Sequence, residues 1–394
     1  MLAGCTRTDP PRFHLNVLDM DQQEVPTAQQ QVIADVLEAM YGTPDEPYVL
    51  AETKLDLKKI EMAAGPVWSD ADGRARGLYR QHCAHCHGTT GDGAGPTAMI
   101  LDPYPRDYRQ GIYKFKSTER GARPTGADLE RIVRLGVPGT AMPSFDLLPD
   151  ADVDALVEYV KYLSMRGETE RALVTAVLDL GEGEPLPLER GTLVDEVLQP
   201  VAERWHTANE AMIALPEKPN VELAASVAKG RELFYGTRAN CVKCHGPSAL
   251  GDGQITDFDD WNKPLAELAR TLGTERDQVD EDKKLSPEDR QKALARIEQL
   301  SALLETALPP RTIRPRNLRL GIYRGGRRPI DLYRRMHAGI NGTPMPGVGP
   351  SGPGAQGTLQ PDEIWQLVDY VRSLPYEPAS AAPRQPQVVP RAQL

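Results

Sequence analysis

Two five-residue stretches decide the fold of this chain: Cys83–His87, which reads Cys-Ala-His-Cys-His, and Cys241–His245, which reads Cys-Val-Lys-Cys-His. Both have the spacing C-x-x-C-H, at which c-type haem is attached covalently. Two thiols three positions apart on one turn reach the vinyl groups on one side of a porphyrin, and the adjacent His supplies a nitrogen to the iron. The attachment and ligand residues are Cys83, Cys86, His87, Cys241, Cys244 and His245. The sequence therefore predicts two covalently bound haem c groups.

A zinc site and a redox-active dithiol are the alternatives for the same residues. Two C-x-x-C pairs that share one zinc ion normally lie about 12 to 20 residues apart. Here Cys83 and Cys241 are separated by 158 positions, and each pair is followed by its own His. The spacing favours haem over both alternatives.

A methionine in a loop of small and stiff residues follows each motif. Gly136–Pro143 reads Gly-Val-Pro-Gly-Thr-Ala-Met-Pro, and Gly339–Pro346 reads Gly-Ile-Asn-Gly-Thr-Pro-Met-Pro, at a constant offset of 203. Met142 and Met345 are thus candidates to bind iron opposite the His, and a gap-filling core role is the alternative. His337 is a weaker competitor of Met345. Ligation by His and Met raises the reduction potential, which suits an electron carrier.

The repetition extends beyond these candidate ligands. Pro105–Asp107 matches Pro315–Asn317 at an offset of 210. Apolar residues at helical spacing predict helices before each motif, between each Pro-Arg block and its Met loop, and after each loop. The expected helices cover residues 73–81, 128–135 and 152–163 in the first copy and 221–235, 330–338 and 362–374 in the second.

This order of elements resembles the class I cytochrome c fold, present twice in tandem over residues 66–165 and 222–376. The resemblance implies a mainly α protein in which the first and last helices of each copy cross beside the haem. It also implies that a proline carbonyl accepts a hydrogen bond from the proximal His. Pro96 is the candidate in the first copy, whereas the second copy has no proline between Gly253 and Trp261.

Five segments are expected along the 394 residues. They are a lipoprotein-like N-terminal segment with a short helix (1–65), a first cytochrome c domain (66–166), a helical linker (167–221), a second cytochrome c domain with a helical insertion at about 254–310 (222–376) and a disordered tail (377–394). Only five Phe are available for the cores, and the haem itself would supply an apolar surface.

Arginines of the repeated blocks and of the segment 311–335 suggest two kinds of contact. Arg106 and Arg316, from the repeated blocks, are candidates for binding haem propionates, because a buried carboxylate needs a partner of opposite charge. Solvated surface arginines are the alternative. Nine Arg occur between Arg311 and Arg335. Those that do not face propionates are a candidate docking patch for an acidic redox partner.

Charge and the N-terminal sequence bear on location. The net charge of −10 excludes nucleic-acid binding through bulk electrostatics, and no apolar run reaches the roughly 18 residues of a transmembrane helix. Met1–Thr6 reads Met-Leu-Ala-Gly-Cys-Thr and resembles the bacterial lipobox, which implies lipidation of Cys5; a chance match is the alternative. Because haem c is attached outside the bacterial cytoplasmic membrane, we expect a lipid-anchored protein on the periplasmic side of that membrane.

Two functions fit these features. The first is a dihaem c-type cytochrome with two His/Met-ligated irons, which carries electrons between redox partner proteins of a bacterial respiratory chain, alone or as a subunit of a membrane complex. The second resembles the dihaem cytochrome c peroxidases, which carry two such motifs at a comparable separation and need one open haem face with acid–base groups nearby. A Met loop in each copy favours the carrier, which has no substrate site.

Overall fold

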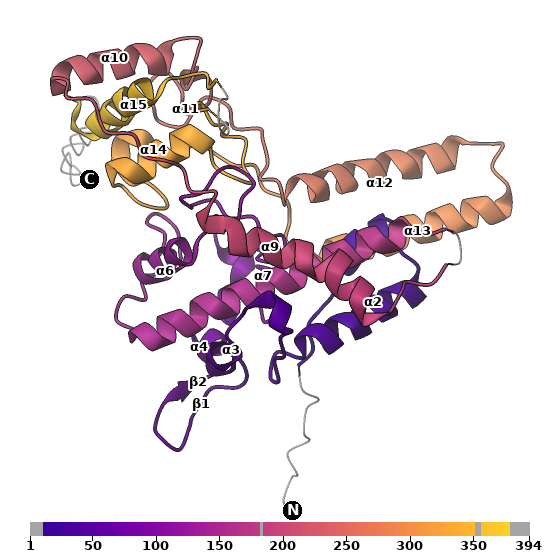
Figure 1. Cartoon of the computed structure of the whole chain (residues 1–394). Coiled ribbons are helices and arrows are strands. Elements are labelled where there is room, and N and C mark those ends of the chain that lie inside the picture. The colour runs from indigo at the N-terminus through magenta and orange to yellow at the C-terminus, as the bar shows by residue number, and fades with distance from the viewer. Residues whose placement is uncertain (1–10, 182–183, 351–355, 379–394) are drawn as a thin grey trace, which may run out of the picture. The chain divides into compact units, whose positions relative to one another are not determined.

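The computed structural model describes residues 11–181, 184–350 and 356–378. It is mainly helical, which confirms the expected fold class (Figure 1). The sheet in the described residues is the antiparallel pair β1 (Trp68–Ser69) and β2 (Ala75–Arg76). Cys5 and the tail from residue 379 onward, on which two of the sequence-based expectations fall, lie outside the described residues.

The chain divides into two compact units. Unit 1 comprises Met1–Ala214, Phe258–Arg311 and Ile340–Pro346, and unit 2 comprises Leu215–Asp257, Thr312–Gly339 and Gly347–Leu394. The helices of unit 1 are α1 (Val17–Gln22), α2 (Thr27–Tyr41), η1 (Ala51–Thr53), α3 (Leu57–Ala63), α4 (Leu78–His82), α5 (Ala84–His87), η2 (Ala98–Ile100), α6 (Gly126–Leu135), α7 (Asp150–Leu178), α8 (Arg190–Thr192), η3 (Leu193–Leu198), α9 (Gln199–His206), η4 (Thr207–Asn209), α12 (Lys263–Glu281) and α13 (Pro287–Thr306). Those of unit 2 are α10 (Leu223–Tyr235), α11 (Val242–His245), η5 (Leu318–Leu320), α14 (Pro329–Ala338), α15 (Pro361–Ser373) and η6 (Leu374–Tyr376).

The long helix α7 organises the core of unit 1, with α2, α3, α4 and α6 packed against it. Tyrosine rings fill much of this core. Tyr41, Tyr79, Tyr159 and Tyr162 are buried, and neighbouring rings have centroids 4.8 to 5.8 Å apart. Aromatic pairs at such distances stabilise a core beyond the area that they bury. Tyrosine thus provides the ring surface that the five Phe do not.

Helix α7 continues well beyond Leu163, where the apolar pattern of the sequence predicts its end. The additional turns bury charged residues in pairs. Arg166 donates to Glu170 at 3.2 Å, and the Oε1 atom of Glu168 accepts a hydrogen bond from the indole of Trp205 at 2.9 Å. Because buried charged residues interrupt the apolar periodicity, the sequence pattern ends before the helix does.

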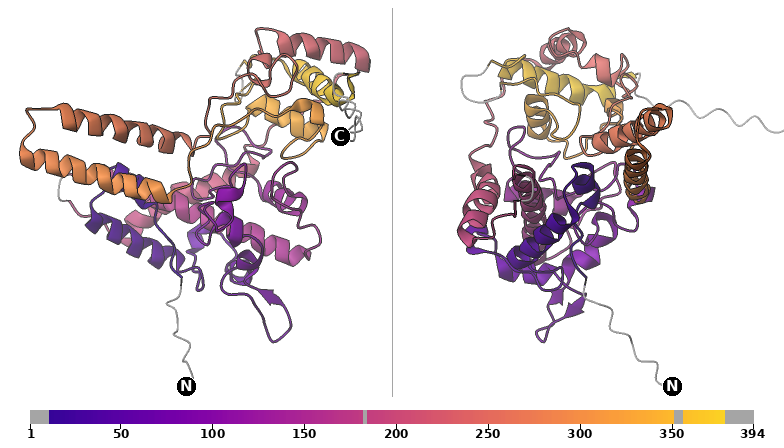
Figure 2. Two further views of the ribbon diagram at one scale, coloured as in Figure 1. Left: turned by 180° about the vertical axis from the view of Figure 1, so that it is seen from behind. Right: turned by 90° about the vertical axis from the view of Figure 1, so that its right-hand side faces the viewer.

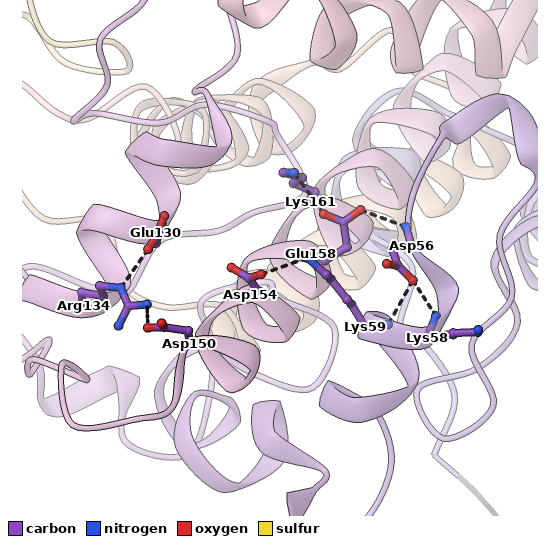
Figure 3. A network of polar contacts seen from close by, with 9 residues as sticks. All are labelled: Asp56, Lys58, Lys59, Glu130, Arg134, Asp150, Asp154, Glu158 and Lys161. Carbon is purple, nitrogen blue, oxygen red and sulfur yellow. Dashed lines mark hydrogen bonds and ion pairs between the residues drawn. The ribbon is translucent and has the colours of Figure 1, made fainter.

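Ion pairs on the surface of unit 1 connect α7 to α3 and α6 (Figure 3). Lys59 of α3 donates to Asp154 of α7 at 3.0 Å. Arg134, in the last turn of α6, reaches Asp150, the first residue of α7, at 2.5 Å. Exposed pairs of this kind add little to stability, so they orient helices that the tyrosine-rich core holds together.

The insertion in the second copy forms a hairpin of two helices, α12 and α13, which run side by side in both views (Figures 1 and 2). Its buried seam consists of Leu268, Leu272, Ile297 and Leu300. Both helices lie within the segment, about 254–310, where an insertion is expected.

In unit 2, α10 crosses α15 at close range. Gly230 of α10 makes this approach possible, since a Cβ atom there would lie 2.1 Å from the carbonyl oxygen of Gln366. The buried carboxylate of Asp369 on α15 accepts hydrogen bonds from Ser226 and Lys218, both at 2.7 Å. The first and last helices of this copy therefore pack on each other as the family resemblance implies.

Candidate haem sites

The first C-x-x-C-H motif forms the short helical turn α5, with Cys83 at the junction to α4. Two contacts fix the imidazole of His87. Its Nδ1 atom donates to the backbone carbonyl of Arg106 at 3.0 Å, and its ring stacks on Tyr108 with centroids 4.7 Å apart. Burial lowers the pKa of His87 to about 4, so the ring is neutral at pH 7. The Nδ1 bond sets the tautomer that directs Nε2 toward a metal.

The second motif repeats this arrangement in unit 2. His245, at the end of α11, donates from Nδ1 to the backbone carbonyl of Arg316 at 3.2 Å. Its ring lies against Phe234 of α10, with centroids 6.2 Å apart. Burial lowers the pKa of His245 as well, so this imidazole is also held in its neutral form.

The carbonyl that holds each His differs from the one implied by the family resemblance. The prediction for Pro96 was wrong: Pro96 is exposed, and the partner of His87 is Arg106. The chain after the motif folds back, with the backbone nitrogen of Gly93 bonded to the carbonyl of His87 at 2.9 Å. In both copies the acceptor is instead the residue after the proline of the repeated Pro-Arg block.

The four motif thiols are free in the structure. Burial raises the pKa of Cys83 to about 12 and that of Cys241 to about 11, whereas a redox-active dithiol needs a thiol that ionises easily. In the described ranges, His, Cys, Asp and Glu residues form no group of three or more that could hold a metal ion. The raised thiol pKa values disfavour the dithiol alternative.

The two Met loops share one hydrogen-bond pattern. In the first, the nitrogen of Val137 donates to the carbonyl of Met142 at 3.2 Å, and Thr140 donates to the carbonyl of Val137 from its nitrogen at 3.1 Å and its hydroxyl at 2.8 Å. The corresponding distances in the second loop, which involve Ile340, Thr343 and Met345, are 3.2, 3.2 and 2.9 Å. The loops are thus two copies of one backbone conformation.

The candidate ligands are distributed over the units as follows. His87 and Met142 both belong to unit 1. Met345 also belongs to unit 1, whereas His245 belongs to unit 2. His337, the weaker competitor, lies buried on α14 of unit 2 with its ring 5.9 Å from that of Tyr333.

The side chains of Arg106 and Arg316 have different surroundings. The Arg106 guanidinium lies 4.1 Å above the ring of Trp261, and burial lowers its pKa to about 10. Arg316 donates from Nη2 to the carbonyl of Ile322 at 3.3 Å, and its buried Nε has no hydrogen-bond partner among the described residues. Burial also lowers the pKa of Arg316. A partly buried cation with an unsatisfied donor fits a carboxylate such as a haem propionate, so the residues near the second motif fit this group.

Most arginines of the proposed docking patch have roles inside the protein. Arg311 donates to the backbone carbonyls of Leu101 and Met99 at 2.7 and 2.8 Å. Other members that bind carbonyls or carboxylates within their own unit are Arg316, Arg319, Arg328 and Arg335. The docking patch stays a prediction.

Comparison with known proteins bears on the first copy. Residues 70–160 match the family model of the cbb3-type cytochrome c oxidase, subunit III. This stretch contains the first C-x-x-C-H motif and the first Met loop. It is a c-type cytochrome domain. A domain of this class carries covalently bound haem c, and its chemistry is electron transfer.

Among solved structures, the chain is similar to a chain of the Kuenenia stuttgartiensis reducing HAO-like protein complex. The identity is 24%, the TM-score is 0.48, and the match covers 76% of this chain and 94% of that chain. No curated protein matches the chain. None of the helices in the described ranges has the length and apolar character needed to cross a bilayer.

Sequence reasoning missed three residues that shape these sites. Tyr108 stacks on His87, Trp261 lies under the Arg106 guanidinium, and Arg120 donates to the carbonyl of Met345 at 2.9 Å. Tyr108 lies just after the repeated Pro-Arg block, but the second copy has Leu318 at the matching position, so the repeat gives no signal for it. Trp261 and Arg120 act across more than a hundred residues, and no local pattern indicates their contacts.

Proposed function

We propose that this chain is a dihaem c-type cytochrome that passes electrons between redox partner proteins of a bacterial respiratory chain. His87 and Met142 would hold the iron of the first haem, and His245 and Met345 that of the second. Arg106 and Arg316 are the candidates for binding the haem propionates. Each bound haem iron takes up and releases one electron. The protein's own residues keep both imidazoles neutral, orient them through Nδ1 and shield them from water.

One observation carries the count of two haems. The second copy repeats the hydrogen bond from the motif His to a Pro-Arg block, at 3.2 Å against 3.0 Å, and also repeats the bonds within the Met loop. A degenerate copy without cofactor has no reason to keep this geometry. Two equivalent Met loops also favour a carrier over a peroxidase-like enzyme, which needs an open iron face.

The proposed location is the periplasmic side of the bacterial cytoplasmic membrane, with a lipid on Cys5. Its support is chemical, because haem c attachment and lipobox processing occur in the same compartment. The donor and acceptor are redox proteins, and a membrane respiratory complex is the partner class that suits an anchored carrier.

The experiment is haem quantification on the full chain produced in a host that matures c-type cytochromes. We expect two covalent haems per chain, and one each in the variants Cys83→Ala/Cys86→Ala and Cys241→Ala/Cys244→Ala. The ferric spectrum should be low-spin, with the weak long-wavelength band of Met sulfur bound to iron. Fewer than two haems in the unmodified chain would overturn the proposal. A high-spin component that binds cyanide and reacts with peroxide would make the peroxidase-like function the better one.

A further inference from the structure

The loop that carries Met345 is held by residues of the stretch 70–160 that matches the family model, which we call the first cytochrome module. Within unit 1, the guanidinium of Arg120 donates from Nη1 to the carbonyl of Met345 at 2.9 Å and from Nη2 to the carbonyl of Thr343 at 3.1 Å. One planar side chain thus binds two carbonyls of the loop at once. Such a two-pronged contact fixes the orientation of a backbone segment better than a single bond does.

A second contact comes from the start of the insertion, also in unit 1. The backbone nitrogen of Asp260 donates to the carbonyl of Gly342 at 3.2 Å. Gly342 is buried and has a φ of 73°, and a Cβ atom there would lie 2.8 Å from Ile112 of the first module. The loop therefore fits closely between the first module and the insertion.

The turn that makes this contact is itself anchored. Asp259 binds Lys114 at 2.8 Å, and the ring of Trp261 lies 4.1 Å from the guanidinium of Arg106 and 4.7 Å from the ammonium of Lys114. An ion pair and two cation–π contacts therefore keep the turn beside the first module.

In the part of the chain that the structure describes, no arginine clamp of this kind holds the Met142 loop. Its carbonyl at Met142 accepts from Val137 of the same loop, and among the described residues no guanidinium binds Met142 or Thr140. The two loops share an internal conformation but differ in what holds them from outside. This difference gives a comparison within one molecule.

We propose that Arg120 is a positioning residue for Met345, so that the first cytochrome module stabilises the methionine ligation of the second haem. This inference rests on the proposed function, since it requires Met345 to bind iron. A methionine loop that is held at its own carbonyls leaves the iron less often, because the open loop would lose both hydrogen bonds to Arg120.

Imidazole competition on the holoprotein tests this role. Added imidazole binds ferric haem only when the methionine has left, so its apparent affinity at each haem reports the stability of the Met–iron bond. In Arg120→Ala we expect about tenfold tighter imidazole binding at one haem, which corresponds to 1.4 kcal/mol. Arg120→Lys, which keeps the charge but not the fork, should show a smaller effect.

Two further variants identify the haem and control for surface charge. In Met345→Ala the same haem should bind imidazole tightly, and the imidazole affinity of the other haem should not change. Arg190→Ala removes an exposed arginine that pairs with Glu52 at 2.9 Å, and it should change neither haem. Arg120 is exposed, so its removal should leave the core and the haem content intact.

The outcomes separate the two proposals. If Met345→Ala changes one haem and Arg120→Ala changes neither, Met345 is a ligand and the positioning role is wrong. If Arg120→Ala acts on the haem that Met142→Ala affects, the role is also wrong. If Met345→Ala itself leaves both titrations unchanged, the ligand assignment of the proposed function fails, and this inference fails with it.

Discussion

Nδ1 of His87 donates to the backbone carbonyl of Arg106 at 3.0 Å, and His245 makes the same bond to Arg316 at 3.2 Å. The two partners are 19 residues apart in the first copy and 71 in the second. In the second copy the insertion therefore lies between the candidate ligand and its hydrogen-bond acceptor, and the bond is present all the same. The backbone of the arginine orients the imidazole, and the side chain of the same residue is left for other contacts.

This division of roles predicts the effect of Arg316→Met. The carbonyl is retained, so the low-spin spectrum should not change. If the proposed second haem is bound there, the loss of a positive charge near it should lower its reduction potential by on the order of 60 mV, which corresponds to about 1.4 kcal/mol, because the reduced haem carries one more negative charge. A spectroelectrochemical titration measures the shift.

Arg314→Met is the matched control, since Arg314 is an exposed arginine two positions away. It should shift the potential by much less. Equal potentials in the Arg316→Met variant and the unmodified protein would instead identify Arg316 as an ordinary surface residue.

We expect Gly136→Ala to distort the loop that carries Met142 and so to break the proposed bond between Met142 and iron. Gly136 has a φ of 64°, and a Cβ atom there would lie 2.4 Å from the carbonyl oxygen of Pro143. We expect the long-wavelength Met band to lose about half its intensity, because one of two equivalent methionines would be displaced. Gly73→Ala controls for backbone strain alone: its φ is 75°, nothing lies within 4 Å of the added Cβ, and the strain costs about 1 to 2 kcal/mol. A full Met band in Gly136→Ala would contradict this role of the glycine.

The C-x-x-C-H motifs, the Met loops and most helix positions follow from local sequence. α6, α14 and α15 begin within two residues of the positions that the apolar pattern predicts. The hydrogen-bond acceptor of His87 could not be predicted from the sequence, because every residue type has a backbone carbonyl. The repeated block, Pro105–Asp107 and Pro315–Asn317, does contain both acceptor residues. Its arginines, however, suggested that the side chain rather than the backbone carbonyl has the role.

Contacts between distant segments were beyond local reasoning. Arg120 and Met345 are 225 residues apart, and neither belongs to a pattern that pairs it with the other. The end of α7 was missed for a related reason, because Glu168 is buried by partners from distant segments rather than by its own helix. Contacts between residues far apart in the sequence therefore make up the part of the site that local sequence patterns do not predict.

Glu168 is the most highly connected of these buried charges. Its carboxylate accepts from Arg123 at 2.9 Å, from Arg204 at 3.1 Å and from Trp205 at 2.9 Å, and its side chain is 1% exposed. Glu168→Gln leaves the two arginines without a counter-charge and should reduce the free energy of unfolding by about 3 kcal/mol. Urea denaturation followed by circular dichroism measures this loss.

The control for Glu168 is Asp154→Asn, which removes the exposed partner of Lys59. This substitution should reduce the free energy of unfolding by less than about 1 kcal/mol. Equal losses in the two variants would mean that the buried cluster is no more important than a surface pair.

Lys116 predicts a pH dependence of stability. Its ammonium donates to the carbonyl and the hydroxyl of Thr118, both at 3.0 Å, and burial lowers its pKa to about 8. Asp128 and Glu119 oppose this shift, and Arg123 and Arg120 add to it.

An unfolded lysine titrates near its ordinary pKa of about 10.4, so between pH 8 and that value the unfolded chain binds more protons than the folded one. The free energy of unfolding should therefore rise with pH above 8, as the cost of keeping a buried ammonium is removed. In Lys116→Met this rise should be absent. Urea midpoints at pH 7.0 to 9.0, a full unit below the ordinary tyrosine pKa of about 10, measure the difference between the two proteins. Parallel pH profiles would show that the folded protein holds Lys116 with an ordinary pKa.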